Sequence, residues 1–141
     1  MKTKVKIAIA EDKELLRKAI ISLIEEDENF QVISESSNGL ELINNLNKNL
    51  PDLILLDYKM PIMDGKDALI TIKKKYPDMK ILILSQCDQS ELIIDLITHG
   101  ANGFISKGAT TEIFFNAINS VICKGKYFDS KISEALLNNL M

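Results

Sequence analysis

The sequence predicts an α/β fold in which a doubly wound parallel sheet is flanked by helices. Strand-like and helix-like segments alternate five times along the 141 residues, without an internal repeat or a low-complexity linker. The strand candidate at 53–57 reads LILLD and stands between Pro51 and Pro61. An apolar run of this kind is typical of a strand that is buried on both faces beneath helices.

The segments before this central strand follow the same alternation. Residues 5–10 form a β-rich run that ends at the acidic pair Glu11-Asp12. A helix is expected over 13–26, a short strand over 30–35, and a second helix after the break at Asn38-Gly39. The apolar residues that define these two helices are Leu15, Leu16, Ala19, Ile20, Leu23 and Ile24 in the first, and Leu42, Ile43 and Leu46 in the second.

The segments after the central strand complete the alternation. Asp64 is a candidate N-cap for a helix that runs through Leu69 and Ile72 to Tyr76. The remaining predicted elements are a strand over 80–85, a helix over about 90–98, a very short strand at 104–105 and a helix over about 111–124.

The last segment, from Tyr127 to Met141, is expected to form a short helical tail. Asp129 or Ser130 can cap this helix. Its apolar residues Ile132, Leu136, Leu137 and Leu140 would share one face, which needs a partner.

Length and composition restrict the class of protein. A chain of 141 residues can form one domain with a single hydrophobic core, and 46% hydrophobic with 26% charged residues is ordinary for a soluble globular protein. The net charge of −3 gives no electrostatic case for nucleic-acid binding by these residues. Cys87 and Cys123 are too few for a metal cage or disulfide framework and fit a cytoplasmic location. The N-terminal residues support neither a signal peptide nor a membrane span.

Polar residues mark the ends of four predicted strands. These residues are Glu11 and Asp12, Asp57, Ser85 and Lys107. The carboxyl ends of parallel strands lie at one edge of a sheet, which is where ligands bind in open α/β sheets. Three carboxylates at one edge repel each other, and a divalent cation with oxygen ligands, usually Mg²⁺, would relieve the repulsion. We therefore expect phosphoryl transfer by positioning and charge neutralisation, with Asp57 as the nucleophile.

Taken one at a time, these residues also have ordinary interpretations. The acidic pair could be first-turn acids that favour the helix dipole, and Asp57 could cap its own turn. Ser85 and Lys107 could be a loop hydroxyl and a solvated surface charge. Their joint placement at strand ends is what favours a functional site.

Seven motifs along the chain resemble the pattern of a two-component response-regulator receiver domain. In order, they are Glu11-Asp12, Asp57, Met60-Pro61, Asp64-Gly65, Ser85, Gly100-Ala101 and Lys107. The resemblance extends over about residues 4–125. It implies a flavodoxin-like, five-stranded parallel sheet of order 2-1-3-4-5 flanked by five helices.

The resemblance also implies roles for the site residues. Asp57 would be the phospho-acceptor, Asp12, Asp57 and the Lys59 backbone carbonyl would bind Mg²⁺ directly, and Glu11 would act mostly through water. A sensor histidine kinase would be the phosphoryl donor, with small phosphodonors such as acetyl phosphate as substitutes. The domain would be a signalling module that catalyses only its own phosphorylation and dephosphorylation.

Three further residues would carry the signal in such a domain. Ser85 would be the switch hydroxyl, Lys107 would pair with the phosphoryl group, and Phe104 would be the rotating aromatic residue. The output surface would comprise the helix at 90–98, the strand at Phe104 and the helix from Thr111. Leu92 and Ile94 leave an apolar excess on the first of these helices, which indicates either a partner contact or singly exposed side chains.

The tail resembles the start of the linker in regulators that carry a LuxR-type helix-turn-helix domain. We therefore expect residues 1–125 to form the receiver domain and 126–141 to form a linker toward an output domain absent from this chain. In the full-length protein, phosphorylation would control dimerisation and transcription, and DNA would be bound only by the absent domain. The alternative is a natural single-domain receiver.

Two other functions compete with this interpretation. One is a receiver-shaped interaction domain that works without phosphorylation. The other is a phosphohydrolase or nucleotide-binding protein with an aspartate nucleophile. Lys59 stands where a second acid would be expected in the latter class, and no glycine-rich phosphate loop follows the first strand.

Overall fold

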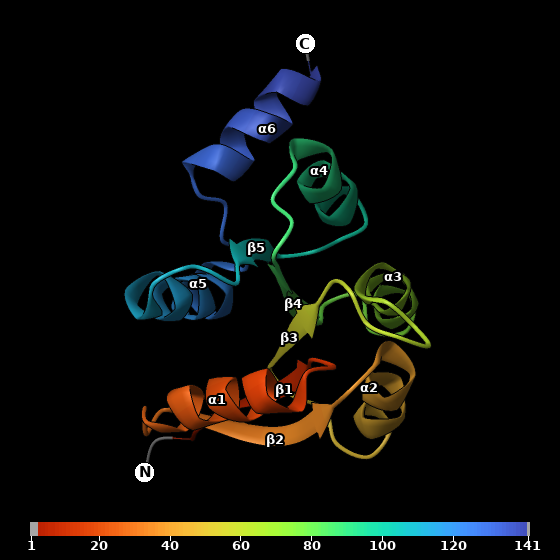
Figure 1. Ribbon diagram of the computed structural model, residues 1–141, viewed down its shortest axis with the longest axis vertical. Coiled ribbons are helices and arrows are strands. Elements are labelled where there is room, and N and C mark those ends of the chain that lie inside the picture. Colours follow the sequence, from red (N-terminus) through yellow and green to blue (C-terminus); the bar gives the residue numbers. More distant parts are fainter. Residues whose placement is uncertain (1–2, 141) are drawn as a thin grey trace.

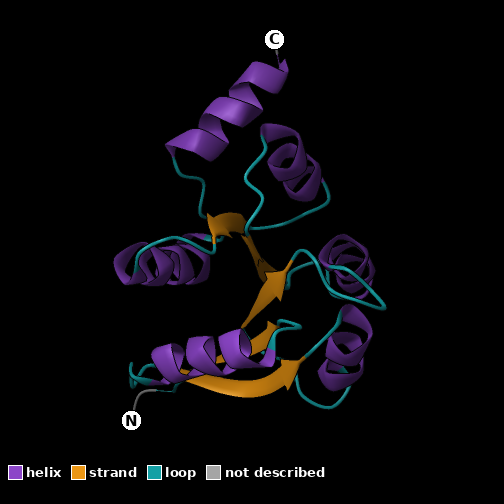
Figure 2. Ribbon diagram, in the orientation of Figure 1, coloured by secondary structure: helices purple, strands orange, loops and turns teal. Residues whose placement is uncertain are grey.

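The protein forms a parallel sheet between two layers of helices, as seen in a computed structural model that describes residues 3–140 (Figures 1 and 2). The five strands have the order β2-β1-β3-β4-β5, so the predicted fold class and strand order are confirmed. The elements are β1 (Val5–Ala10), α1 (Glu14–Glu25), β2 (Phe30–Ser36), α2 (Gly39–Leu46), β3 (Leu53–Asp57), α3 (Gly65–Lys75), β4 (Lys80–Ser85), α4 (Ser90–Thr98), β5 (Gly103–Ser106), α5 (Thr111–Lys124) and α6 (Ser130–Leu140).

Both faces of the sheet are buried. Helices α1 and α5 cover one face, and α2, α3 and α4 cover the other (Figure 1). Every residue of β3 is buried, because this central strand packs against helices on both sides. The predicted doubly covered strand is therefore confirmed.

Strand register brings the carboxyl ends of the strands to one edge. Ala10 of β1 lies beside Leu56 of β3, and Asp57 lies beside Leu84 of β4. Ser85 in turn pairs with Ser106 at the end of β5. The residues that follow β1, β3, β4 and β5 consequently meet at this edge.

The predicted buried stripe of α1 is wrong at its N-terminal end. Leu15 is 86% exposed and Ala19 is also exposed, whereas Ile24 is completely buried. Leu15 precedes Ile24 by nine residues, which places it about 180° around an α-helix. The two residues therefore cannot face the sheet together.

The C-terminal helix α6 packs against α4, and this supplies the partner that its apolar stripe requires (Figure 1). Asp129 is the cap, since its Oδ1 accepts a hydrogen bond from the Ile132 N–H at 2.9 Å. Ile132 is buried, but Leu137 and Leu140 are 61% and 83% exposed, so the predicted four-residue stripe is only partly buried. Figure 1 shows the reason: the C-terminal end of α6 projects away from the sheet.

The helices were compared with the length and apolar character of a membrane span. Across residues 3–140, no helix combines the length and apolar character needed to cross a membrane.

Gly65 is required by a close approach of α3 to the end of β3. Its N–H donates to the Tyr58 carbonyl at 2.8 Å, and a Cβ atom here would collide with the Asp57 carbonyl oxygen and lie 2.8 Å from the Tyr58 Cα. Backbone atoms cannot yield as a flexible side chain would. The loop between β3 and α3 therefore has no space for a side chain at this position.

We predict that Gly65→Ala lowers the free energy of unfolding by about 1–3 kcal/mol, the usual cost of overpacking. Urea unfolding monitored by circular dichroism measures the change. Gly108→Ala is the matched control, because its Cβ atom would meet nothing closer than 3.7 Å. Equal unfolding midpoints for the two variants would contradict the steric argument.

Candidate functional site

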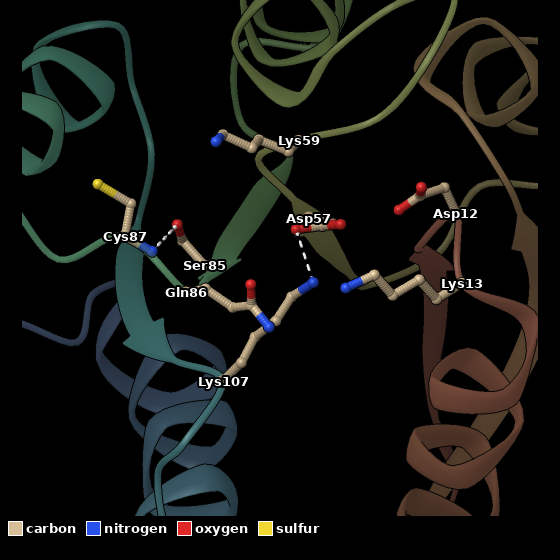
Figure 3. Close-up of a pocket in the computed structure, with 8 residues that line it drawn as sticks. All are labelled: Asp12, Lys13, Asp57, Lys59, Ser85, Gln86, Cys87 and Lys107. Atoms are coloured by element: carbon tan, nitrogen blue, oxygen red, sulfur yellow. Dashed lines mark hydrogen bonds and ion pairs between the residues drawn. The ribbon is translucent and has the colours of Figure 1, made fainter.

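The polar residues at the strand ends gather in one place (Figure 3). Asp57 and Ser85 are each 2% exposed, Glu11 is fully buried, and Asp12 is exposed. One carboxylate oxygen from each of Glu11, Asp12 and Asp57 lies within 4.8 Å of the other two. The acids therefore converge as expected.

Lys107 neutralises part of this acidic cluster. Its Nζ lies 2.6 Å from Glu11 Oε1 and 3.0 Å from Asp57 Oδ1, and its side chain is only 11% exposed. Buried carboxylates without a counter-charge are strongly destabilising. A lysine at the end of β5 thus makes two of the three acids compatible with the interior.

Burial and neighbouring charges change the pKa values of these groups. Burial raises the pKa of Asp57 to about 6, the nearby Glu11 charge adds to this effect, and the hydrogen bond from Lys107 opposes it. Burial also disfavours the charge on Glu11, but hydrogen bonds from Lys107 and the Lys13 N–H outweigh it and lower the pKa of Glu11. Glu11 is therefore the more readily ionised of the two, and Asp57 becomes a carboxylate near neutral pH.

Arg17 holds the loop that carries Glu11 and was missed from the sequence. Its Nη1 donates to the Glu11 carbonyl oxygen at 2.9 Å, and its Nε pairs with Glu35 Oε1 on β2 at 2.8 Å. A planar guanidinium suits two simultaneous contacts better than a lysine does. The sequence feature that could have drawn attention to this residue is that Arg17 is the only arginine among the 141 residues.

The site opens into a hollow of about 350 Å³. Lys13 and Lys107 extend their ammonium groups toward Asp57 from different elements, and Lys59 lies at the rim (Figure 3). Lys13 and Gln86 had not been predicted to line this hollow. Its lining residues are Asp12, Lys13, Asp57, Lys59, Ser85, Gln86, Cys87 and Lys107.

The two predicted switch residues lie in different surroundings. Ser85 lines the hollow, and its Oγ accepts a hydrogen bond from the Cys87 N–H at 3.0 Å. Phe104 is 4% exposed and belongs to the apolar cluster beneath α4 and α6. The structure therefore separates Phe104 from the hollow and places it in the core.

The donor set fits a hard divalent cation. Glu11, Asp12 and Asp57 offer carboxylate oxygens, the ligand type that Mg²⁺ and Ca²⁺ prefer. Asp12 is exposed and lines the hollow, so a hydrated ion can reach this side of the cluster.

Comparisons with known proteins agree with this arrangement. A family model described as the response regulator receiver domain matches residues 7–119. The chain is 30% identical over 139 residues to the oxygen regulatory protein NreC of Staphylococcus carnosus, covering 96% of this chain and 63% of that protein. It is 28% identical over 134 residues to the transcriptional regulatory protein DegU of Brevibacillus brevis, covering 95% and 57%. The chain thus spans about three fifths of the length of these curated relatives.

Solved structures show the same fold. A LuxR-family two-component response regulator from Aurantimonas sp. SI85-9A1 superposes with a TM-score of 0.88 at 20% identity, covering 98% of this chain and 99% of that chain. A LuxR-family DNA-binding response regulator from Staphylococcus aureus superposes with a TM-score of 0.78 at 26% identity, covering 84% and 98%.

The raised pKa of Asp57 has a consequence for stability. An acid with a higher pKa in the folded than in the unfolded chain binds more protons when folded, so stability falls as the pH rises from about 4 to about 6. We predict that Asp57→Asn, without divalent metal, raises the free energy of unfolding by about 1–3 kcal/mol at pH 7.5 and much less at pH 4. Urea unfolding at both pH values measures this difference.

Asp78→Asn is the control for this comparison, because Asp78 is exposed and precedes β4, at the opposite end of this strand from Ser85. It should change stability little at either pH. A loss of stability in Asp57→Asn at pH 7.5, or the same gain at both pH values, would contradict the electrostatic account.

Proposed function

The chain belongs to the response-regulator receiver family, and from this premise we propose that Asp57 accepts a phosphoryl group from a phosphohistidine of a sensor kinase in a Mg²⁺-dependent reaction. Membership of the family confirms the resemblance seen in the sequence. A receiver domain is a signalling module and not a conventional enzyme.

One observation carries the proposal. Asp57 is a buried carboxylate that opens into the hollow, with Lys107 at 3.0 Å and two further acids close enough to share a cation. An aspartate with a purely structural role in a core would need only the lysine as its counter-charge. Burial raises the pKa of Asp57, and the Glu11 charge adds to this effect. Both additional acids have a use if a cation and a phosphoryl group join them.

The proposed reaction is an in-line displacement at phosphorus. An Asp57 carboxylate oxygen forms the new P–O bond while the P–N bond to the donor histidine breaks, and the electron pair of that bond remains on the imidazole nitrogen. Lys107 moves from neutralising Asp57 to pairing with a phosphoryl oxygen, and the Ser85 hydroxyl donates to another. Lys13 adds a positive charge that attracts the anionic donor.

We assign the metal to Asp12, Asp57 and the Lys59 backbone carbonyl, with Glu11 acting mostly through water. When bound, Mg²⁺ would neutralise phosphoryl oxygens and relieve repulsion among the carboxylates. The chain itself supplies the positioning: Arg17 fixes the Glu11 backbone, and Lys107 keeps Glu11 and Asp57 together before the metal binds.

Phosphorylation is proposed to alter an output surface formed by α4, β5 and α5. The phosphoryl group would draw Ser85 inward, and Phe104 would respond from beneath that surface. We assign residues 1–125 to the receiver and 126–141 to a linker, with cytoplasmic transcriptional control through dimerisation and a DNA-binding domain in a longer protein. The relatives' names and greater lengths support this assignment.

Intact-mass spectrometry with acetyl phosphate and Mg²⁺ tests the proposed function. We predict one phosphoryl adduct on the wild-type chain and on Asp78→Asn, none on Asp57→Asn, and none when EDTA replaces Mg²⁺. An unmodified wild-type chain would favour an interaction domain that works without phosphorylation. Steady release of phosphate from a phosphomonoester would instead favour a phosphohydrolase.

A further inference from the structure

The face formed by α4 and β5 is occupied by the chain's own C-terminal helix (Figure 1). Ile132 and Ala135 of α6 are 1% and 4% exposed. Ile132 belongs to the same apolar cluster as Ile93 of α4 and Phe104 of β5, and Leu92 packs against this cluster. The apolar excess predicted on α4 is therefore partly covered within the chain.

The segment that leads into α6 is fixed along β5. The Tyr127 N–H donates to the Asn102 carbonyl at 2.9 Å, and the Asn102 side-chain amide donates to the Gly125 carbonyl at 2.9 Å. Tyr127 also forms an isolated parallel bridge with Gly103. These contacts determine where α6 begins, so its position on α4 is defined and not that of a loose tail.

A second contact connects α6 to the loop beside Asp57. Lys131 of α6 forms an ion pair with Asp88, which lies three residues after Ser85. Between these two residues, Gln86 and Cys87 line the hollow, and the Cys87 N–H bonds to Ser85 Oγ. The loop that follows Ser85 is thus also in contact with α6.

This loop has few restraints of its own. Gln89, the residue before α4, makes no capping side-chain hydrogen bond, unlike the residues that precede α2, α3 and α5. Lys131 and Asp88 are more than half exposed, so their ion pair is weak and the apolar contact of Ile132 provides most of the docking energy. A shift of the loop therefore acts on α6 mainly by moving the start of α4, since Ile132 and Ile93 of α4 belong to one apolar cluster.

We propose that the α4–β5 face is a docking surface for α6 and that phosphorylation of Asp57 weakens this docking. The inference rests on the proposed function and specifies its output. A phosphoryl group draws Ser85 inward, residues 86–88 follow, and Asp88 moves away from Lys131 while the start of α4 shifts beneath Ile132. The helix then has a docked and a released state, and phosphorylation shifts the equilibrium toward the released state.

The coupling between Asp57 and α6 can be measured at either site, because it is reciprocal. If a ligand at Asp57 loosens α6, then loosening α6 by mutation must tighten binding of that ligand, and complete release of α6 sets the upper limit of this change. Beryllofluoride with Mg²⁺ is a suitable non-covalent probe of the phosphoryl position, and the full 141-residue chain is the suitable protein.

Hydrogen exchange of residues 130–140, with and without saturating beryllofluoride and Mg²⁺, tests the first direction. We expect exchange in α6 to become at least threefold faster with the probe, and Asp57→Asn to show no change. Beryllofluoride that binds the wild-type chain without altering α6 exchange would overturn the docking inference alone. Failure of the probe to bind the wild-type chain would overturn the proposed function and this inference together.

Fluorine NMR titration of the probe tests the reverse direction. Ile132→Glu should bind beryllofluoride three- to tenfold more tightly than the wild-type chain, whereas Leu140→Glu, at an exposed position of the same helix, should match the wild-type chain. Unchanged affinity in a folded Ile132→Glu variant would contradict the coupling.

A surface variant provides the same test without disturbing the core. Lys131→Glu should tighten probe binding about twofold through repulsion from Asp88, and the exchanged pair Lys131→Glu with Asp88→Lys should reverse this change. Tighter binding that persists in the exchanged pair would exclude the ion pair as the link.

Discussion

The structure of the site depends on the ammonium group of Lys107, which lies between two buried carboxylates. Its Nζ is 2.6 Å from Glu11 and 3.0 Å from Asp57, so the ends of β1, β3 and β5 are connected through one charge. Without this contact, two acids in the interior would repel each other and lack solvation. The burial needed to make Asp57 reactive is tolerable because Lys107 is there.

Lys107 only partly offsets the cost of burying these carboxylates, so a bound ligand can stabilise the site further. The pKa of Asp57 remains raised to about 6, because burial and the Glu11 charge exceed what Lys107 offsets. Asp12 brings a third carboxylate from the exposed side of the cluster. A cation bound to the acids would reduce the repulsion between the carboxylates, and an anion would pair with the lysine side chains. Phosphoryl transfer requires both kinds of charge neutralisation.

The sequence predicted the fold and the meeting of the strand-end residues because both follow from local patterns. Asp57 terminates a strand too apolar to be anything but central, and parallel pairing brings its neighbours to the same edge. Arg17 escaped detection because its two partners, the Glu11 carbonyl and Glu35, are brought together only by the packing of α1 beside β2. Periodicity likewise could not show that Leu15 faces solvent or that α6 docks on α4, since both depend on where each helix crosses its neighbour. The roles of Ser85, Phe104 and Lys107 in phosphorylation remain predictions.

We infer that the three acids at this edge share a cation, and a Mg²⁺ titration followed by isothermal calorimetry tests whether they do. We expect one Mg²⁺ site in the wild-type chain. Its affinity should fall at least tenfold in Asp12→Asn, which alters the exposed member of the cluster, and should be unchanged in Asp78→Asn. Equal Mg²⁺ affinity in all three proteins, or no binding in the wild-type chain, would contradict it.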